Sequence, residues 1–244
     1  LLAACGPYLR AIVVAALETG MRKGEILSLQ WHQVEGMRID ASTTPPTITW
    51  APKAELLLPK TKTKTKRDRK IPISSTLKSV LDMRRLDPAG QTHPLDGFVF
   101  GSEISTRVTT FKRAWLTAML KSHGQTPTYS KGANLTPESR AALKTIDLHF
   151  HDLRREAGSR WMDAGVPIAT IQAWLGHENV SQTSTYLARS AEAEHAAMAR
   201  FEAHVALQRI ATEASKGSTQ RPKSAAVRKG KPSKTAVGRG PAIM

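Results

Sequence analysis

Apolar residues recur at every third or fourth position along several parts of the chain, which is the spacing of one face of an α-helix. The first such segment, residues 7–19, begins at Pro7 and is followed by Gly20. Proline suits a first helical turn, and glycine suits the left-handed position after a helix end. A short second helix should begin at Arg22. The same spacing predicts further helices at residues 74–86, 109–122 and 190–213.

Between residues 36 and 70 this spacing is replaced by short runs rich in Ile, Thr and Leu. Pro45-Pro46 and Pro52 should separate the runs, because proline cannot donate a ladder hydrogen bond. The predicted strands are residues 37–41, 47–50, 56–59 and 69–73. The pattern therefore predicts an α+β protein that is mostly helical, with a small antiparallel β-sheet near its N-terminal third.

Residues 148–187 combine polar side chains with clear helix signals. His151 and Arg154 are three positions apart, which places them on one face of a helix. Gly165 and the proline two positions later end that helix and begin another, expected over residues 167–175. His177 directly follows the glycine that ends this second helix, and Tyr186 comes after a polar run. Two histidines, an arginine and a tyrosine thus stand at or near helix ends.

The charge of the chain favours a polyanionic partner. Lys and Arg number 36 against 20 acidic residues, so the 244-residue chain has a formal net charge of +16. Nucleic acid is the first candidate, ahead of a membrane surface. Residues 214–244 contain eight Lys or Arg and no acidic residue. The same segment is rich in Pro, Gly and Ser. It is expected to form a disordered basic tail that binds DNA nonspecifically, after a folded domain at residues 1–213.

A second basic cluster lies between two predicted strands. Seven of the eleven residues from 60 to 70 are Lys or Arg, and four lysines alternate with threonines. An extended ribbon of this kind can lie along a phosphate backbone. The DNA contacts predicted in this cluster are Lys60, Lys62, Lys66, Arg67, Arg69 and Lys70. Arg155, which directly follows Arg154, is predicted to contact DNA as well.

Few other features of the sequence bear on the cellular compartment of the protein. Cys5 is the single cysteine, so no disulfide can form within the chain. No run of 18 apolar residues predicts a transmembrane helix, and the first residues do not resemble a signal peptide. The chain lacks an initiator Met, which suggests that it begins inside a longer product.

Four motifs, in order, resemble those of the tyrosine recombinases, the phage integrase family. The first is Arg22 within Thr19-Gly20-Met21-Arg22-Lys23-Gly24-Glu25. The second and third are His151-Asp152-Leu153-Arg154 and Leu175-Gly176-His177, and the fourth is Thr185-Tyr186-Leu187. The resemblance covers roughly residues 1–200. One departure is Arg155-Glu156-Ala157, where the family often has His-Thr after the arginine.

The resemblance implies the integrase catalytic fold and a set of site residues. Arg22 and Arg154 would clamp a phosphate of DNA, and His177 would add a donor. His151 would accept the proton of the nucleophile Tyr186, and Glu25 would brace Arg22. In the family a lysine of the β-hairpin protonates the leaving 5′ oxygen. Residue spacing selects Lys64 for this role, with Lys62 and Lys66 as open alternatives.

The resemblance also implies a biological setting. The reaction would pass through a covalent 3′-phosphotyrosine and need no metal or other cofactor. The expected partner is double-stranded DNA at attachment or recombination sites. A homotetramer would form there and exchange C-terminal segments, with accessory DNA-bending proteins and no membrane contact. The biological role would be integration or excision of a phage or mobile element. The protein would act in the cytoplasm of a bacterial host, at the nucleoid. The family's N-terminal DNA-clamping (core-binding) domain has no counterpart in this sequence.

Three other interpretations remain open at this point. His149-Phe150-His151 is also typical of metal-dependent relaxases, although the two arginine motifs would then have no role. A type IB topoisomerase shares the chemistry but lacks site pairing, and the Leu-Gly-His motif favours a recombinase. A catalytically impaired, DNA-binding integrase fragment is the third. Resistance of cleavage to chelators would exclude the first, and a covalent DNA adduct would exclude the last.

Overall fold

The computed structural model describes residues 1–59, 68–130 and 134–177, and seven positions between 198 and 207. The chain divides into two units, Leu1–Ser190 and Ala191–Met244. In the second unit, the described positions 198–199, 202–203 and 205–207 are helical, as expected within the predicted helix at 190–213. The predicted tail, residues 214–244, lies outside the described residues.

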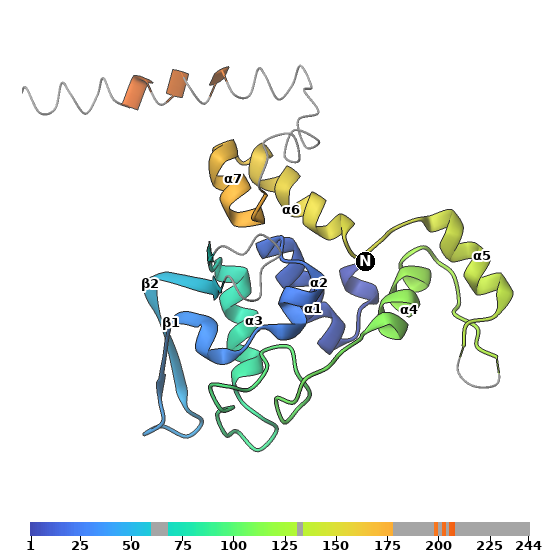
Figure 1. Ribbon diagram of the computed structural model, residues 1–244, viewed down its shortest axis with the longest axis horizontal. Helices are drawn as coiled ribbons and strands as arrows, with labels where there is room; N and C mark the ends of the chain where they lie inside the picture. The colour runs from blue at the N-terminus through green and yellow to red at the C-terminus, as the bar shows by residue number, and fades with distance from the viewer. Residues whose placement is uncertain (60–67, 131–133, 178–197, 200–201, 204, 208–244) are drawn as a thin grey trace, which may run out of the picture. The chain divides into compact units, whose positions relative to one another are not determined.

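Helix α1, Pro7–Thr19, is central to the first unit (Figure 1) and has the predicted bounds. Gly20 ends it in the left-handed conformation, at φ 59°. One face of α1 is fully buried, and the helix packs against α3, Ser75–Arg85, and α6, Asp152–Asp163. Because α1 contacts elements from both halves of the first unit, it joins the N-terminal motif to the later ones.

A three-stranded antiparallel sheet has the order β1-β2-β3. Its strands are β1 (Val34–Asp40), β2 (Thr47–Leu58) and β3 (Arg69–Pro72). The prediction that Pro52 ends a strand is wrong, because β2 continues through it. The register between β1 and β2 shifts at Gly36, so residues 51–54 stand opposite that one residue. A proline in such a bulge removes no regular ladder hydrogen bond.

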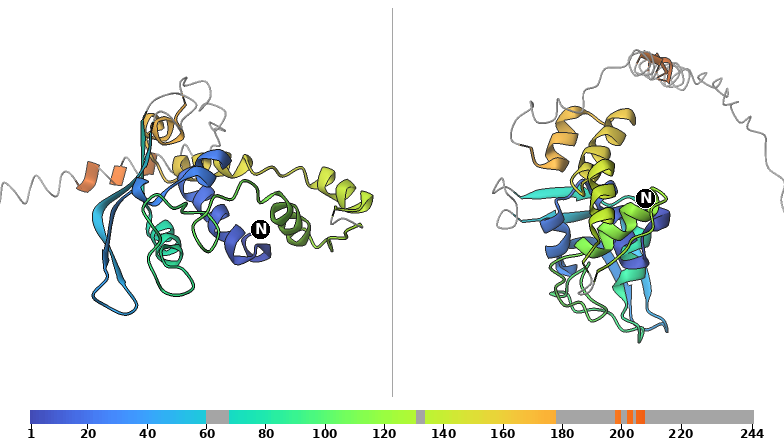
Figure 2. Two further views of the ribbon diagram at one scale, coloured as in Figure 1. Left: turned by 60° about the horizontal axis from the view of Figure 1, so that its bottom comes forward. Right: turned by 90° about the vertical axis from the view of Figure 1, so that its right-hand side faces the viewer.

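The described residues also form four further helices and two short 3₁₀ turns. Their bounds are α2 (Lys23–Ser28), α4 (Lys112–Ser122), α5 (Pro137–Ile146) and α7 (Ile168–Leu175), with 3₁₀ turns at Leu2–Ala4 and Trp31–Gln33. Helix α5 was not predicted, although Thr136 caps it and Pro137 begins it. Helix α4 begins three residues later than expected. The edge strand β3 lies beside α7, as Figures 1 and 2 show.

Ser74 caps α3, since its hydroxyl oxygen accepts the Leu77 backbone N–H at 3.2 Å. Ser74 also donates to Glu18 of α1 at 2.6 Å, and Glu18 lies 3.6 Å from Arg160 of α6. These polar contacts hold α3 and α6 to the same central helix. Among the described residues, no helix is both long enough and apolar enough to cross a membrane.

Candidate active site

Arg22 stands at the junction between α1 and α2, where it is the N-cap residue of α2. Its backbone N–H donates to Glu25 Oε2 at 2.8 Å, and its guanidinium Nη1 donates to Glu25 Oε1 at 3.1 Å. The Glu25 side chain is only 6% exposed, whereas that of Arg22 is 29% exposed. Two hydrogen bonds therefore hold Arg22 to Glu25 and leave part of the guanidinium group open to solvent.

Arg154 is the most deeply buried charged residue of the site, at 2% exposure. It lies in the first turn of α6, which packs on α1. Its Nη1 donates to the Gly20 carbonyl oxygen at 2.6 Å, and its Nη2 donates to the Leu175 carbonyl oxygen. Arg154 thus ties the first motif to the Leu175-Gly176-His177 motif through two main-chain oxygens.

His177 follows α7, which Gly176 ends in the left-handed conformation at φ 65°. Burial, together with the positive charges of Arg154, Arg22 and Arg69, lowers the pKa of His177 from 6.5 to about 4. His177 is therefore neutral at pH 7 in the absence of an anion. Burial is the largest cause of this shift, and the charges of three arginines act on the ring in the same direction, so this place would attract a phosphate.

His151 is exposed and is the N-cap residue of α6, at the helix start predicted for it. Burial of part of the ring and the charges of Arg154 and Arg155 lower its pKa below 6.5, against the opposite effect of Asp152. A neutral imidazole has a free lone pair and can accept a proton. The charge of Arg22 has a smaller effect in the same direction, so arginines of the first and second motifs both act on the His151 ring.

Arg69 differs from its prediction. It was expected to contact DNA, but its side chain is 5% exposed and donates to Glu25 at 2.6 Å and to the Leu175 carbonyl oxygen at 2.9 Å. The alternation of β3 explains the difference: Arg69 and Ile71 point to the buried face, and Lys70 and Pro72 to the exposed one. Strand periodicity could have separated Arg69 from Lys70 at the level of sequence.

The exposed members of the predicted DNA-binding set that the structure describes are Lys70 and Arg155. Lys70 Nζ lies 3.0 Å from Glu35 and 3.4 Å from Glu55, and its hydrogen bond to Glu35 raises its pKa. Arg155 lies 3.2 Å from Asp152. Both remain accessible, so their contact with DNA stays a prediction. The other residues proposed for DNA contact or chemistry lie outside the described residues: Lys60, Lys62, Lys64, Lys66, Arg67 and Tyr186.

A hollow of about 510 Å³ lies beside Arg22 and is also lined by Glu25, Gln30 and Arg107. Arg107 is exposed and comes from the long connection between α3 and α4. Sequence reasoning missed it, because no motif or periodicity marks that connection. Arg22 therefore borders an open hollow, and a second arginine, Arg107, lines the same hollow.

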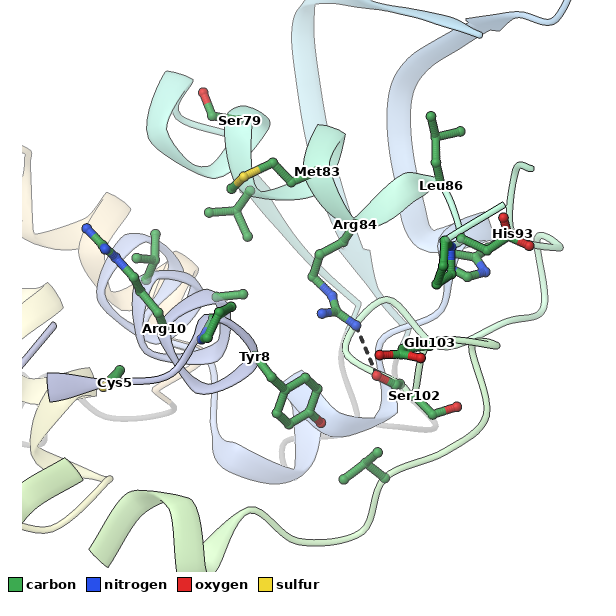
Figure 3. Close-up of a pocket in the computed structure, with 18 of the residues that line it drawn as sticks. Cys5, Tyr8, Arg10, Ser79, Met83, Arg84, Leu86, His93, Ser102 and Glu103 are labelled. Atoms are coloured by element: carbon green, nitrogen blue, oxygen red, sulfur yellow. Dashed lines mark hydrogen bonds between the residues drawn. The ribbon is translucent and has the colours of Figure 1, made fainter. Parts of the chain in front are cut away.

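A larger cavity, of about 1340 Å³, lies between α1, α3 and the connection near residue 101 (Figure 3). Of the candidate catalytic residues that the structure describes, none lines it. Arg84 points into it and donates to the carbonyl oxygens of Val99 at 2.6 Å and Gly101 at 2.9 Å. Volume alone therefore does not locate the site that the arginines define.

The described residues also bear on the histidines considered for a metal. His149 is exposed, and its Nδ1 lies 3.7 Å from Asp147 and 3.9 Å from Asp152. Within the described ranges, no three His, Cys, Asp or Glu side chains form a group able to hold a metal ion.

Comparison with known proteins identifies the family. Residues 1–193 match the family described as "Phage integrase family". The match covers most of the chain, which therefore belongs to the phage integrase family. The arginine and histidine motifs whose geometry is described above all lie within the matched region.

Two curated relatives are recombinases. The chain is 29% identical over 172 residues to a shufflon-specific DNA recombinase of Escherichia coli, covering 70% of this chain and 32% of the relative. It is 28% identical over 197 residues to a "Tyrosine recombinase XerC-like" protein of Caldanaerobacter subterraneus subsp. tengcongensis, covering 73% and 45%. The chain thus spans less than half the length of either relative.

Solved structures with a similar chain path include other integrases. One is the integrase of transposon Tn1549 in complex with a circular intermediate DNA, with 19% identity and a TM-score of 0.44 over 78% of this chain and 58% of that one. Another is the catalytic domain of bacteriophage HP1 integrase, with 21% identity and a TM-score of 0.43 over 76% and 79%.

Proposed function

We propose that this chain is the catalytic part of a site-specific DNA recombinase that cleaves and rejoins strands through a covalent 3′-phosphotyrosine at Tyr186. The observation that carries the proposal is that three motifs meet at one place: Arg154 donates to the carbonyl oxygen of Gly20, two residues before Arg22, and to that of Leu175, two residues before His177. The positive charges of Arg154, Arg22 and Arg69 also act on the His177 ring, which suits a phosphate. The family and both curated relatives, a shufflon-specific recombinase and a XerC-like recombinase, support the same reaction class.

Arg22 and Arg154 would hold the two non-bridging oxygens of the scissile phosphate. Guanidinium groups suit this role because they donate paired, charge-assisted hydrogen bonds and stay protonated. Negative charge on these oxygens grows as the fifth oxygen approaches phosphorus, so the attraction is strongest in the transition state. A bound phosphate would also offset the arginine charges around His177 and raise its pKa, which would strengthen its donation to the phosphate.

The proton transfers complete the reaction. His151, neutral at pH 7, would take the proton of the Tyr186 phenol, whose ordinary pKa is about 10. The phenolate oxygen would bond to phosphorus as the bond to the 5′ oxygen breaks. Lys64 would give that oxygen its proton, with Lys62 and Lys66 as alternatives. A 5′ hydroxyl of another strand would then attack phosphorus and release Tyr186, so the reaction consumes no nucleotide cofactor.

The wider setting is part of the same proposal. The substrate would be double-stranded DNA, contacted by the predicted DNA-binding residues other than Arg69 and by the tail at residues 214–244. Four copies would assemble on paired sites and exchange their C-terminal segments, with accessory DNA-bending proteins. The biological outcome would be integration or excision of a phage or other mobile element, in the bacterial cytoplasm at the nucleoid.

Covalent capture tests the proposal directly. The full chain would be incubated with a pool of end-labelled, nicked duplexes that carry a randomised target region, and a denaturing gel would separate protein-linked DNA. We expect an adduct that peptide mapping assigns to Tyr186. The variant Tyr186→Phe loses one oxygen at nearly constant volume, so it should bind DNA and form no adduct. Binding without any adduct in the unchanged chain would favour the impaired, DNA-binding alternative.

A further inference from the structure

Arg69 joins two parts of the site through a single buried guanidinium group. Its Nη2 donates to Glu25 Oε2 at 2.6 Å, and its Nη1 donates to the Leu175 carbonyl oxygen at 2.9 Å. The other oxygen of Glu25 accepts from Arg22. The same Leu175 carbonyl oxygen also accepts from Arg154. Arg69 therefore stands between the two arginines that the proposed reaction needs.

The turn that carries His177 rests directly on the Arg69 side chain. A Cβ atom at Gly176 would lie 2.8 Å from Arg69 Nη1 and 3.2 Å from Arg69 Cδ. Real Cβ atoms essentially never approach another atom as closely as 2.8 Å, and Gly176 also has φ +65°. The absence of a side chain at Gly176 is thus what allows Arg69 to lie under the Leu175-Gly176-His177 turn.

Stability alone does not account for an arginine at this position. Burial of the guanidinium group is costly and lowers the pKa of Arg69, although the Glu25 carboxylate opposes this. The Nε atom of Arg69 is buried and has no hydrogen-bond partner among the described residues, which adds a further cost. A well-packed apolar side chain would fill the space without either cost. The benefit of arginine here is geometric, because its fork reaches two acceptors at fixed separation.

We propose that Arg69 is a positioning residue of the active site, which sets Arg22 through Glu25 and His177 through the Leu175 carbonyl oxygen. The inference rests on the proposed function and deepens it. It assigns to β3 a role different from DNA contact: the strand carries the buried link between the first arginine motif and the Leu-Gly-His motif. Loss of the link should displace both groups at once, with little effect on the exposed cations that bind DNA.

Variants of Arg69 test the link against a matched buried arginine. Arg69→Met keeps much of the volume and removes both hydrogen bonds, whereas Arg69→Lys keeps the charge but cannot reproduce the fork. Arg85→Met is the control, since Arg85 is 4% exposed, bonds to the His93 carbonyl oxygen and lies 4.9 Å from the centre of the Trp31 ring, outside the site. Thermal melting would report the loss of stability in each variant.

The first readout is single-turnover cleavage at saturating DNA, at a temperature where every variant is folded. Removing a residue that orients a catalytic group typically lowers activity about 10- to 100-fold. We expect a loss of this size for Arg69→Met, an intermediate loss for Arg69→Lys and a wild-type rate for Arg85→Met. DNA affinity should change less than about threefold in all three, since phosphate contacts elsewhere supply most of it. A wild-type cleavage rate in Arg69→Met would overturn the inference.

The second readout needs no DNA and so separates this inference from the proposed function. The His177 ring would be titrated by NMR in the unchanged chain and in each variant. Burial and several positive charges, that of Arg69 among them, lower the pKa of His177 to about 4, so Arg69→Met should raise the midpoint, while Arg85→Met should not. An unchanged midpoint in Arg69→Met overturns the inference whether or not the chain cleaves DNA. Failure of the unchanged chain to form an adduct would refute the proposed function alone.

Discussion

Gly20 and Leu175 approach each other so closely that a Cβ atom at Gly20 would lie 2.6 Å from Leu175 Cδ2. They belong to the first and third motifs of the site, 155 positions apart in the chain. Arg154 donates to the carbonyl oxygens of both. In the candidate active site, the absence of a side chain at Gly20 leaves room for Leu175 next to the residues that Arg154 holds.

Gly20→Ala should destabilise the protein by about 1–3 kcal/mol, because it combines a left-handed backbone position with overpacking against Leu175 and Trp161. Denaturant unfolding would measure the change. Gly24→Ala is the matched control, since a Cβ there meets nothing within 4 Å and Gly24 lies in α2. Alanine should be neutral or slightly stabilising at that position. Equal effects of the two substitutions would contradict this account.

Glu25→Gln should flatten the dependence of stability on pH in the acidic range. Burial alone would raise the pKa of Glu25, but the charge of Arg69 and hydrogen bonds from Arg22 and Arg69 outweigh it and hold the pKa below 4.5. A depressed carboxyl pKa contributes stability above the unfolded value, and this stability is lost as pH falls through the folded value. The difference in unfolding free energy between the two proteins should therefore be greatest above about pH 4.5 and shrink below it. A constant difference across this range would exclude the ionised pair.

Arg22→Ala should leave the fold intact and slow cleavage. The side chain is 29% exposed and pairs with Glu25, which keeps its bond to Arg69. Loss of one donor to a developing oxyanion typically costs about 10²–10³ in rate. Single-turnover adduct formation would measure the loss, and DNA affinity should fall only modestly. Turnover near the wild-type rate would remove Arg22 from the phosphate clamp.

Arg107→Ala should weaken DNA binding without slowing cleavage at saturating DNA. Arg107 is exposed and lines the hollow beside Arg22, where the backbone next to the scissile phosphate would lie. Loss of one phosphate contact should reduce the slope of log affinity against log salt by about 0.9. Binding measured at several salt concentrations checks this. An unchanged slope would show that Arg107 does not contact DNA.

Removal of residues 214–244 should lower nonspecific affinity and flatten its salt dependence. The segment carries eight of the 36 basic residues and no acid. Each phosphate contact that is lost should reduce the slope by about 0.9 on duplex DNA. A scrambled tail of the same composition should restore the slope, because nonspecific attraction depends on charge and not on order. A truncated chain with the original slope would place the tail away from DNA.

The sequence by itself determined the local helices and strands and the kinds of side chain that make up the candidate site. The bounds of α1, the Ser74 cap of α3 and the helix junction at Gly165 all follow from signals within a few residues. Capping and backbone preferences act over one turn, so neighbouring residues suffice to predict them. Even so, α5 was missed, although Thr136 and Pro137 are the local signals of a helix start.

Only the tertiary structure decided which of these residues meet. Arg69 lies 44 residues from Glu25 and 106 from Leu175, and its burial against both makes it an internal link where charge alone suggested a DNA contact. Arg107 reaches the rim beside Arg22 from a connection with no motif. Such contacts arise from the packing of α6 on α1 and of α7 on β3, which involves segments far apart in the chain. Local sequence preferences carry no information about that packing, because its energy depends on surfaces that exist only once the chain has folded.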